Sequence, residues 1–406
     1  MTDTPTMPHG EFEALAKDFA AHVSPGKLEF WRALGPIVMG KRYGIYFEDA
    51  YTHKRYINCH VNGGCYNLGH ANAAVSDAVR NVIGTLDIGN HHFVSSYRAE
   101  FARRLSATTG DRLARVVFAV GGGEAADLAI KVARARTGRV EVVSALGGYH
   151  GHTGLALATG DAKFRDRFGP NPRGYRQVPW DDLAAMDAAI GDQTAAVILE
   201  AIPATLGMTL PSDGYFARVR QLCSDRGAML LVDEVQTGLG RTGKLWGHQH
   251  EGIVPDAIIS GKGLSGGIYP IAATLMTEDL HAPLNADPFV HISTYGGAEI
   301  GCVAGLAVLD QVEVPGFLAR VTALGERFER ELSPLPLTLR RRGMFMGLKF
   351  ADSSASLTTW VQLMANGVFA FPAGNDSTVL QFLPPMIISD DEATDLIARV
   401  HKSVAR

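Results

Sequence analysis

Six short runs of apolar residues, separated by stretches with helical periodicity, constrain the fold of this chain more than any other feature. Strands that are apolar on both faces are typical of parallel sheets covered by helices on both sides. The pattern therefore predicts an α/β fold with a mostly parallel central sheet, in which ligands bind beyond the carboxyl ends of the strands. The runs are VVFAV (116–120), VEVVS (140–144), AAVIL (195–199), MLLV (229–232), AIIS (257–260) and IAATLM (271–276).

The two ends of the chain have different patterns. Residues 11–34 are typical of an amphipathic helix broken near Ser24-Pro25-Gly26, and residues 43–60 alternate as in a small antiparallel sheet. After residue 300 the alternation of strands and helices stops, and two helices, a strand pair near 337–350 and a closing helix from Asp390 are predicted. We expect a small-domain contribution from residues 1–65, a large cofactor-binding domain over 66–312, and a small α+β domain over 313–406.

Composition excludes several classes of partner. A formal net charge of −4 offers no basic surface for nucleic acid. No segment approaches the ~20 apolar residues of a membrane span, and the first residues lack the pattern of a secretory signal. The four cysteines form no CxxC pair, which argues against a metal site or a disulfide framework. We therefore expect a soluble, cytoplasmic protein without a metal.

A glycine cluster and a lysine follow two of the predicted strands. Gly121, Gly122 and Gly123 open a predicted helix, where backbone N–H groups at the positive end of the helix dipole can bind a phosphate. Such a cluster is about as often only a tight turn. Lys262 lies in a glycine-rich loop after AIIS, where burial can lower its pKa enough for Schiff-base chemistry.

An aromatic residue and two acids end three other strands. Tyr149 lies in GGYHGH after VEVVS and can either stack on a planar cofactor or simply pack in its loop. Glu200 and Asp233 end apolar strands, and a buried carboxylate needs a partner or a function, although Asp233 can also be a helix cap. Pyridoxal phosphate (PLP) needs a phosphate anchor, a stacking ring, an acid for its ring nitrogen and a lysine, so these residues together indicate a PLP enzyme.

Longer motifs resemble the class-III aminotransferases, which are PLP enzymes of fold type I, from about residue 30 to the C-terminus. The segments are LLVDEVQTGLGRTGKLW (230–246), IISGKGLSGGIYPIAATL (258–275) and HISTYGGAE (291–299). The resemblance implies that Lys262 forms the Schiff base with PLP, that Asp233 binds its ring nitrogen and that Gln236 lies near its hydroxyl. It also implies that Gly122 and Gly123 bind the phosphate, that Tyr149 stacks on the ring, and that His150 and Glu200 belong to the cofactor site.

The resemblance further implies a homodimer, because the threonine corresponding to Thr294 reaches the phosphate in the neighbouring subunit of these enzymes. Each of the two active sites would then be built from both chains.

The sequence departs from the family at three substrate-binding positions. His152 replaces the arginine of YHGRT, Thr205 stands at the second glutamate of EPxQGEGG, and Gln381 replaces the arginine before LxPP. In the family that glutamate and arginine form a switch that frees the arginine for a substrate carboxylate. Both members are missing here, so the usual bidentate carboxylate contact is absent. Arg340, Arg341 and Arg342 can substitute for it or form an ordinary solvated strand edge.

The leading hypothesis is an aminotransferase that moves an amino group from an amine or amino acid to an oxo-acid without this switch. The alternative is an ammonia-lyase or phospholyase acting on an amine with a phosphonate or phosphate group, such as hydroxy-aminoethylphosphonate. The histidines of the predicted pocket, His150 and His152 with His91 and His92 nearby, favour such an anion. Racemases also occur on this fold, and a non-catalytic binding protein is disfavoured because Lys262 and Asp233 are both present.

Overall fold

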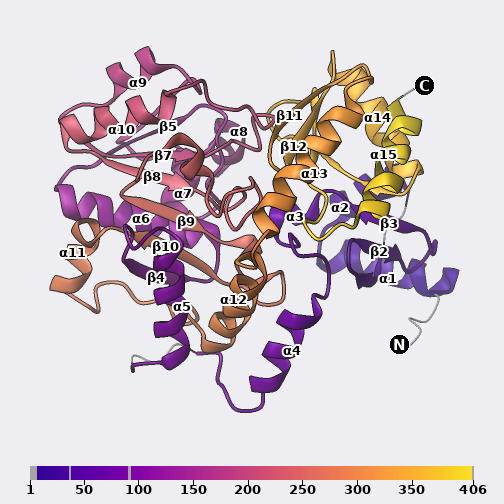
Figure 1. The fold of residues 1–406 in the computed structure, drawn as a ribbon, viewed down its shortest axis with the longest axis horizontal. Helices are drawn as coiled ribbons and strands as arrows, with labels where there is room; N and C mark the ends of the chain where they lie inside the picture. Colours follow the sequence, from indigo (N-terminus) through magenta and orange to yellow (C-terminus); the bar gives the residue numbers. More distant parts are fainter. Residues whose placement is uncertain (1–6, 36–37, 90–92, 405–406) are drawn as a thin grey trace.

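The computed structural model describes residues 7–35, 38–89 and 93–404. A seven-stranded sheet forms the larger part of the molecule, in the order β4-β10-β9-β8-β7-β5-β6 (Figure 1). Only β10 runs antiparallel to its neighbours, which confirms the mostly parallel sheet predicted from the sequence. The strands are β4 (Arg115–Ala119), β5 (Glu141–Ala145), β6 (Tyr175–Val178), β7 (Thr194–Glu200), β8 (Met229–Asp233), β9 (Ala257–Ser260) and β10 (Ala272–Met276).

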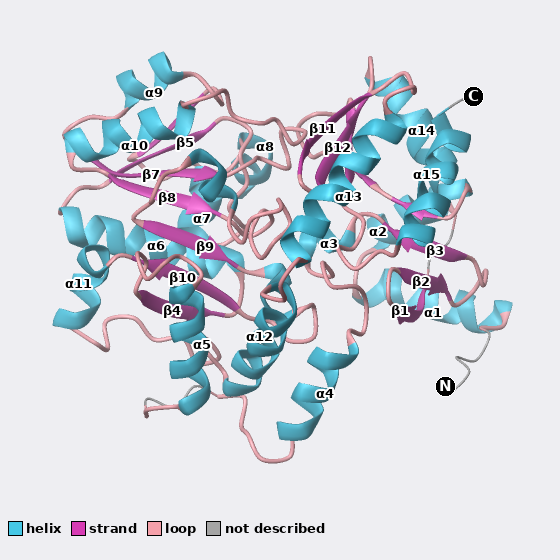
Figure 2. Cartoon of the chain, viewed as in Figure 1, coloured by secondary structure: helices cyan, strands magenta, loops and turns pink. Residues whose placement is uncertain are grey.

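Helices cover both faces of this sheet (Figure 2). Alternate strand residues point to opposite sides, and those on both sides are apolar and buried, so each face needs a covering layer. In β7, Ala196 and Ile198 belong to the core cluster that contains the buried residues of α6, whereas Val197 and Leu199 belong to the cluster that contains those of α10. The helices of this part are α5 (Ser96–Ala107), α6 (Gly122–Thr137), α7 (Gly154–Thr159), α8 (Ala162–Arg165), α9 (Leu183–Ala189), α10 (Tyr215–Arg226), α11 (Glu278–Ala286) and α12 (Glu299–Val312), with short 3-10 turns η1 (Asp166–Phe168), η2 (Gly247–Glu251) and η3 (Lys262–Ser265).

Two four-stranded sheets lie beside the larger part. One has the order β1-β2-β3-β13 and therefore joins the N-terminal strands to a strand from near the C-terminus, whereas the other has the order β11-β12-β15-β14. Their strands are β1 (Met39–Tyr43), β2 (Tyr46–Asp49), β3 (Arg55–Asn58), β11 (Thr338–Arg342), β12 (Phe345–Lys349), β13 (Val368–Phe369), β14 (Phe371–Pro372) and β15 (Val379–Phe382). The remaining helices are α1 (His9–His22), α2 (Pro25–Leu34), α3 (Val61–Gly64), α4 (Ala73–Val82), α13 (Phe317–Leu332), α14 (Ser353–Ala365) and α15 (Asp390–Val404).

Most elements lie where the sequence predicts them. The break near Ser24 separates α1 from α2, since Ser24 caps α2 by accepting a hydrogen bond from Lys27 N. Strand β6 was not predicted, because its sequence YRQV lacks an apolar run and only its neighbour β5 holds it in the sheet. In the described part of the chain no single helix is long and apolar enough to cross a membrane, although α12 and α13 pass that test as a pair bent by 69°.

A buried arginine connects the large part of the molecule to the smaller sheets. Arg241 is fully buried and donates to Asn67 Oδ1 at 2.6 and 3.1 Å, to Pro384 O at 2.7 Å and to Met344 O at 3.1 Å. Burial lowers the pKa of its guanidinium to about 9. Three segments far apart in the sequence are therefore held by one side chain.

Helix α13 packs closely on the turn between β11 and β12, and this contact tests the fold. A Cβ added at Gly325 would lie 2.1 Å from Gly343 O, a backbone atom that cannot move alone. We expect Gly325→Ala to lower the free energy of unfolding by about 1–3 kcal/mol, measured by urea denaturation. The control is Gly10→Ala, where nothing lies within 4 Å of the added atom. Equal stability of the two variants would contradict this packing.

Candidate active site

One cavity lies at the carboxyl edge of the seven-stranded sheet, where β4, β5, β7, β8 and β9 all end. Its lining brings together eight residues predicted for the site: Gly122, Gly123, Tyr149, His150, Glu200, Asp233, Gln236 and Lys262. Four other lining residues were not predicted as site residues: Gly151, Ile202, Val235 and Thr237. Thr237 could have been predicted from the sequence, since it follows Gln236 in the long motif, whereas an isoleucine such as Ile202 gives no chemical indication of a binding role.

The glycines after β4 make a close-packed cradle. Gly121 caps α6, and Gly122 and Gly123 form its first turn, so their N–H groups lie at the positive end of the helix. A Cβ added at Gly122 would lie 3.1 Å from Val235 Cγ2, and one at Gly123 would lie 2.9 Å from Thr153 Oγ1. Only glycine therefore allows α6 to begin this close to the loops after β5 and β8.

Asp233 and His150 form a buried pair. His150 Nδ1 lies 2.9 Å from Asp233 Oδ2, and Asp233 Oδ1 accepts from Val235 N at 3.0 Å. Burial alone would lower the pKa of His150, but the hydrogen bond and charge of Asp233 outweigh it and raise that pKa. His150 Nε2 is buried and has no hydrogen-bond partner within the described residues. The bond to Val235 N closes a local turn, and no helix follows β8 among the described residues before η2, so Asp233 is not the helix cap that was the alternative expectation.

Glu200 lies in the wall of the cavity next to this pair. Its Oε1 accepts from Tyr149 N at 3.0 Å and its Oε2 from Ala204 N at 3.3 Å. Burial raises the pKa of Glu200 to about 7, with a contribution in the same direction from Asp233 and an opposing one from His150. Near neutral pH this carboxyl group is therefore divided between its charged and neutral forms.

Lys262 begins η3 with a left-handed backbone, φ +46°, which is unusual for a residue with a side chain. Its Nζ lies 3.2 Å from the oxygen of the Gln236 amide, oriented so that the amide nitrogen donates to Gly63 O at 3.2 Å. Burial lowers the pKa of Lys262, and the charges of Asp233, Cys65 and Glu200 act against that effect. This lowering of the pKa favours a neutral amine that can act as a nucleophile or base.

The three departures from the family pattern lie outside this cavity. His152 is exposed and contacts the edge of the Tyr149 ring, with the ring centroids 5.1 Å apart. Thr205 Oγ1 donates to Gly147 O at 2.9 Å. Gln381 is buried in β15, and its Oε1 has no partner within the described residues. Their expected substrate roles stay predictions.

Other candidates from the sequence are placed as follows. Arg340 donates to Gly207 O at 2.7 Å and to Thr209 Oγ1 at 3.1 Å, and Arg341 and Arg342 pair with Glu329 and Glu251. The triplet is thus engaged within the fold. Thr294 is exposed and does not line the cavity of its own chain. His91 and His92 lie outside the described residues.

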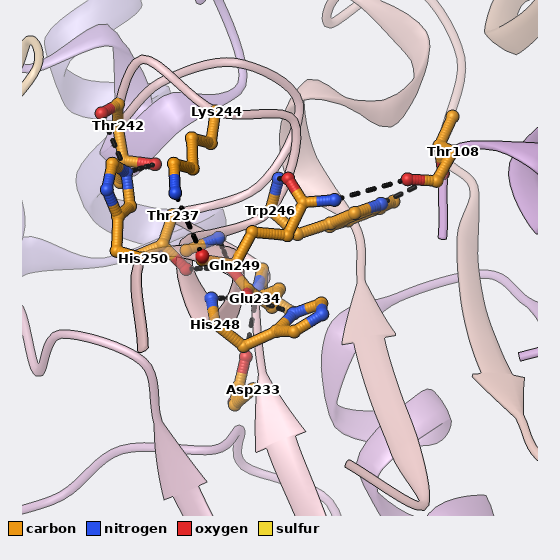
Figure 3. Close-up of polar contacts among 12 residues, drawn as sticks. Thr108, Asp233, Glu234, Thr237, Thr242, Lys244, Trp246, His248, Gln249 and His250 are labelled. Atoms are coloured by element: carbon orange, nitrogen blue, oxygen red, sulfur yellow. Dashed lines mark hydrogen bonds and ion pairs between the residues drawn. The ribbon is translucent and has the colours of Figure 1, made fainter. Parts of the chain in front are cut away.

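A buried carboxylate next to Asp233 holds the following loop in place (Figure 3). Glu234 accepts from Gly247 N at 2.8 Å, from His248 N at 2.7 Å and from the Thr237 hydroxyl, and His248 Nδ1 lies 3.0 Å away. Farther along, Trp246 Nε1 donates to Thr108 Oγ1 at 2.8 Å. The loop that carries Gln236 and Thr237 into the cavity is therefore closed by hydrogen bonds between its last residues and Glu234, near its start.

We expect Glu234→Gln to lower the free energy of unfolding by about 1.5–3 kcal/mol, because an amide NH₂ would face backbone donors in place of a carboxylate oxygen. The measurement is the thermal midpoint together with proteolysis of the 234–251 loop. Glu326→Gln, at an exposed position, is the matched control. A variant as stable and protease-resistant as the control would show that the loop does not depend on this carboxylate.

The raised pKa of Glu200 predicts a pH-dependent stability in the ligand-free protein. Because its folded pKa lies above the unfolded value, the contribution is present below pH ~4.5 and is lost as the pH rises through about 7. We expect the stability of the wild type relative to Glu200→Gln to fall by roughly 3 kcal/mol between pH 4 and 8. Thermal midpoints of both proteins across this range test it, and parallel pH profiles would contradict it.

Comparison with known proteins identifies the family. The family described as Aminotransferase class-III matches residues 32–404. An uncharacterized aminotransferase of Archaeoglobus fulgidus is 44% identical over 381 residues, which cover 92% of this chain and 90% of that protein.

Solved structures agree with this assignment. The ornithine aminotransferase of Toxoplasma gondii, described with partial occupancy of PLP at its active site, superposes with a TM-score of 0.87 at 26% identity, over 98% of this chain and 94% of that one. An (S)-enantioselective omega-transaminase from Thermomicrobium roseum superposes with a TM-score of 0.87 at 25% identity, over 97% and 98% of the two chains. The protein therefore belongs to the class-III aminotransferases and uses pyridoxal phosphate as its cofactor.

Proposed function

We propose that this enzyme transfers an amino group from a small-molecule amine or amino acid to an oxo-acid, with Lys262 as the proton carrier and without a glutamate–arginine carboxylate switch. The observation that carries the proposal is the convergence of Lys262, Asp233 and the Gly122–Gly123 cradle on one cavity. Each of these groups comes from the end of a different strand, so only the folded sheet brings them together.

The cavity fits PLP on the chemistry of its walls. The first turn of α6 offers backbone N–H groups for a phosphate, in a space that a Cβ at Gly123 would reduce. Tyr149 offers its ring as a stacking surface, and its ring edge contacts with His152 and Phe164 hold that surface in place. Gln236 lies beside Lys262, where its amide can meet the cofactor hydroxyl.

Asp233 suits the ring nitrogen of PLP, because its carboxylate is buried and already oriented by Val235 N and His150 Nδ1. A carboxylate there holds a proton on that nitrogen. When bound, PLP then supplies an electron sink for the carbon that carries the substrate amine.

Lys262 performs the proton transfers in this proposal. Its lowered pKa leaves a fraction of the amine neutral, so Nζ can remove a proton from the amine-bearing carbon of the substrate. Gln236 accepts a hydrogen bond from Nζ and thereby limits where that nitrogen can move. Ile202 and Val235 provide apolar surface at the cavity wall.

Two side chains support the proposal that the glutamate–arginine switch is missing. The Thr205 hydroxyl is engaged with Gly147 O, and Gln381 offers an amide where the family offers a guanidinium. The lyase alternative relied on several histidines around the site. Of the two that the structure describes, His150 lines the cavity with its Nδ1 already bound to Asp233, and His152 lies outside it.

We also propose a cytoplasmic homodimer with active sites shared between the subunits. All four cysteines are free thiols, which suits a reducing compartment. The exposed segment before α12 carries Thr294 together with several large apolar side chains: Phe289 (62% exposed), Val290 (60%), Ile292 (56%) and Tyr295 (52%). A partner subunit on this segment would cover them and bring Thr294 toward its own cofactor.

The test is Lys262→Ala, assayed with a panel of amines, amino acids and aminophosphonates. We expect a loss of turnover of at least ~100-fold, because general acid–base catalysis at this position contributes about 10²–10⁴. Lys402→Ala, at an exposed position near the C-terminus, is the control.

In the wild type, one amine should convert the bound cofactor stoichiometrically, seen as bleaching of its visible absorbance, and an oxo-acid should restore the band. Catalytic release of ammonia or phosphate without such bleaching would instead identify a lyase. Near-normal turnover of Lys262→Ala would overturn the role of this residue.

A further inference from the structure

Three residues from different parts of the chain form a hydrogen-bonded junction beside the active site. Asn375, in the loop between β14 and β15, donates from its backbone N to Thr205 O at 2.8 Å and from Nδ2 to Gly147 O at 2.6 Å. Thr205 Oγ1 donates to the same Gly147 O at 2.9 Å. This set, which we call the Gly147 junction, connects the loops after β5 and β7 to the smaller sheet β11-β12-β15-β14.

The junction holds the start of the loop that carries Tyr149. Gly147 lies two residues before Tyr149, which lines the cofactor cavity and whose own N donates to Glu200 Oε1 at 3.0 Å. Gly147 is buried with φ +77°, and a Cβ added there would lie 2.4 Å from Leu206 Cδ2. The loop is thus packed too closely for a side chain at Gly147, and hydrogen bonds fix it at both ends.

The loop that provides Asn375 is anchored on both sides of that residue. Lys163 of α8 donates to Gly374 O, and Asp376 Oδ2 lies 3.5 Å from Arg340 Nη1. The same Arg340 nitrogen donates to Gly207 O at 2.7 Å, so it also binds the loop after β7. The Asn375 amide therefore reaches Gly147 O from a loop that is itself held in place.

The two side-chain donors of the junction share one acceptor. The carbonyl oxygen of Gly147 has two lone pairs, and Thr205 Oγ1 and Asn375 Nδ2 each bond to it. Loss of one donor leaves the carbonyl with a partner, whereas loss of both leaves a buried acceptor unpaired, which is far more costly. Thr205 stands at the second glutamate of EPxQGEGG, so this chain has an uncharged donor bound within the fold at that position.

We propose that Asn375 is a positioning residue for the cofactor site: through Gly147 O it holds the loop that carries the ring of Tyr149, and Thr205 shares this function. The inference rests on the proposed stacking of Tyr149 on the cofactor. The smaller sheet thereby contributes to cofactor binding, although among the described residues no member of β11, β12, β14 or β15 lines the cofactor cavity.

The dissociation constant of PLP, measured by titrating the cofactor-free enzyme, tests the proposal without any substrate. We expect Asn375→Ala and Thr205→Val each to raise this constant about 3-fold, because each removes one donor. The double variant should raise it at least ~30-fold, above the ~9-fold product of the single effects, because Gly147 O is then unpaired. Asn81→Ala and Thr358→Val, at exposed helical positions, are the matched controls.

Three further readouts separate positioning from a general loss of stability. At saturating PLP, the visible circular dichroism of the bound cofactor should weaken in the double variant, because its ring is held less firmly. Thr205→Ser keeps the hydroxyl and should bind PLP like the wild type. Tyr149→Ala should raise the dissociation constant about 10-fold. In that background Asn375→Ala should have no further effect, because no ring is left to position.

A double variant with the affinity and circular dichroism of the wild type would overturn the role of Asn375. An equal effect of Asn375→Ala with and without the Tyr149 ring would also overturn it, because the loop would then act by another route. Unchanged PLP binding by Tyr149→Ala would remove the stacking on which the inference rests. None of these measurements contains an amine, so a failure of amino transfer would refute the proposed function and leave this inference standing.

Discussion

The buried carboxylate of Glu234 is the interaction on which the rest of this structure depends. Glu234 accepts hydrogen bonds from the first two backbone N–H groups of η2. The loop that these bonds close carries Gln236 and Thr237 to the cavity and Arg241 to the smaller sheets. A carboxylate fully supplied with donors is stable when buried, whereas one that has lost a donor is not. The same loop therefore positions residues of the cofactor pocket and joins that pocket to the smaller sheets through Arg241.

The chemistry of the site depends on where its few protons lie. Burial raises the pKa of Glu200; the charge of His150 opposes this effect and the charge of Asp233 adds to it. Burial acts to lower the pKa of His150, but its hydrogen bond with Asp233 raises that pKa, while Glu200 retains a proton up to a pH of about 7. Lys262 is influenced by both acids, but burial dominates and lowers its pKa. Position relative to solvent thus decides which group holds a charge before any substrate arrives.

Much of the fold and the cofactor pocket could be predicted from the sequence. Apolar runs indicate buried parallel strands, and the residues that follow each run are expected at the carboxyl edge of the sheet, where ligands bind. Lys262, Asp233, Glu200 and Tyr149 all belong to this class of signal. Strand β6 escaped prediction because its burial comes from its neighbour rather than from its own composition. The contact between His60 and Phe371 could not be predicted for a related reason: the two residues are far apart in the sequence, and nothing in either segment indicates that they meet.

The pairing of β3 with β13 sets an order of events during synthesis. The segment that contains β3 and His60 is synthesised early, but Ile57 and Asn58 can pair with their parallel partners only after Val368 and Phe369 have been made. Contacts this distant in the chain form slowly. The seven-stranded sheet and its cofactor pocket lie wholly between these two segments and can assemble first. A nascent chain can therefore form the strand that carries its reactive lysine before the segment around Gly63, which lies against that lysine, is held in its final place.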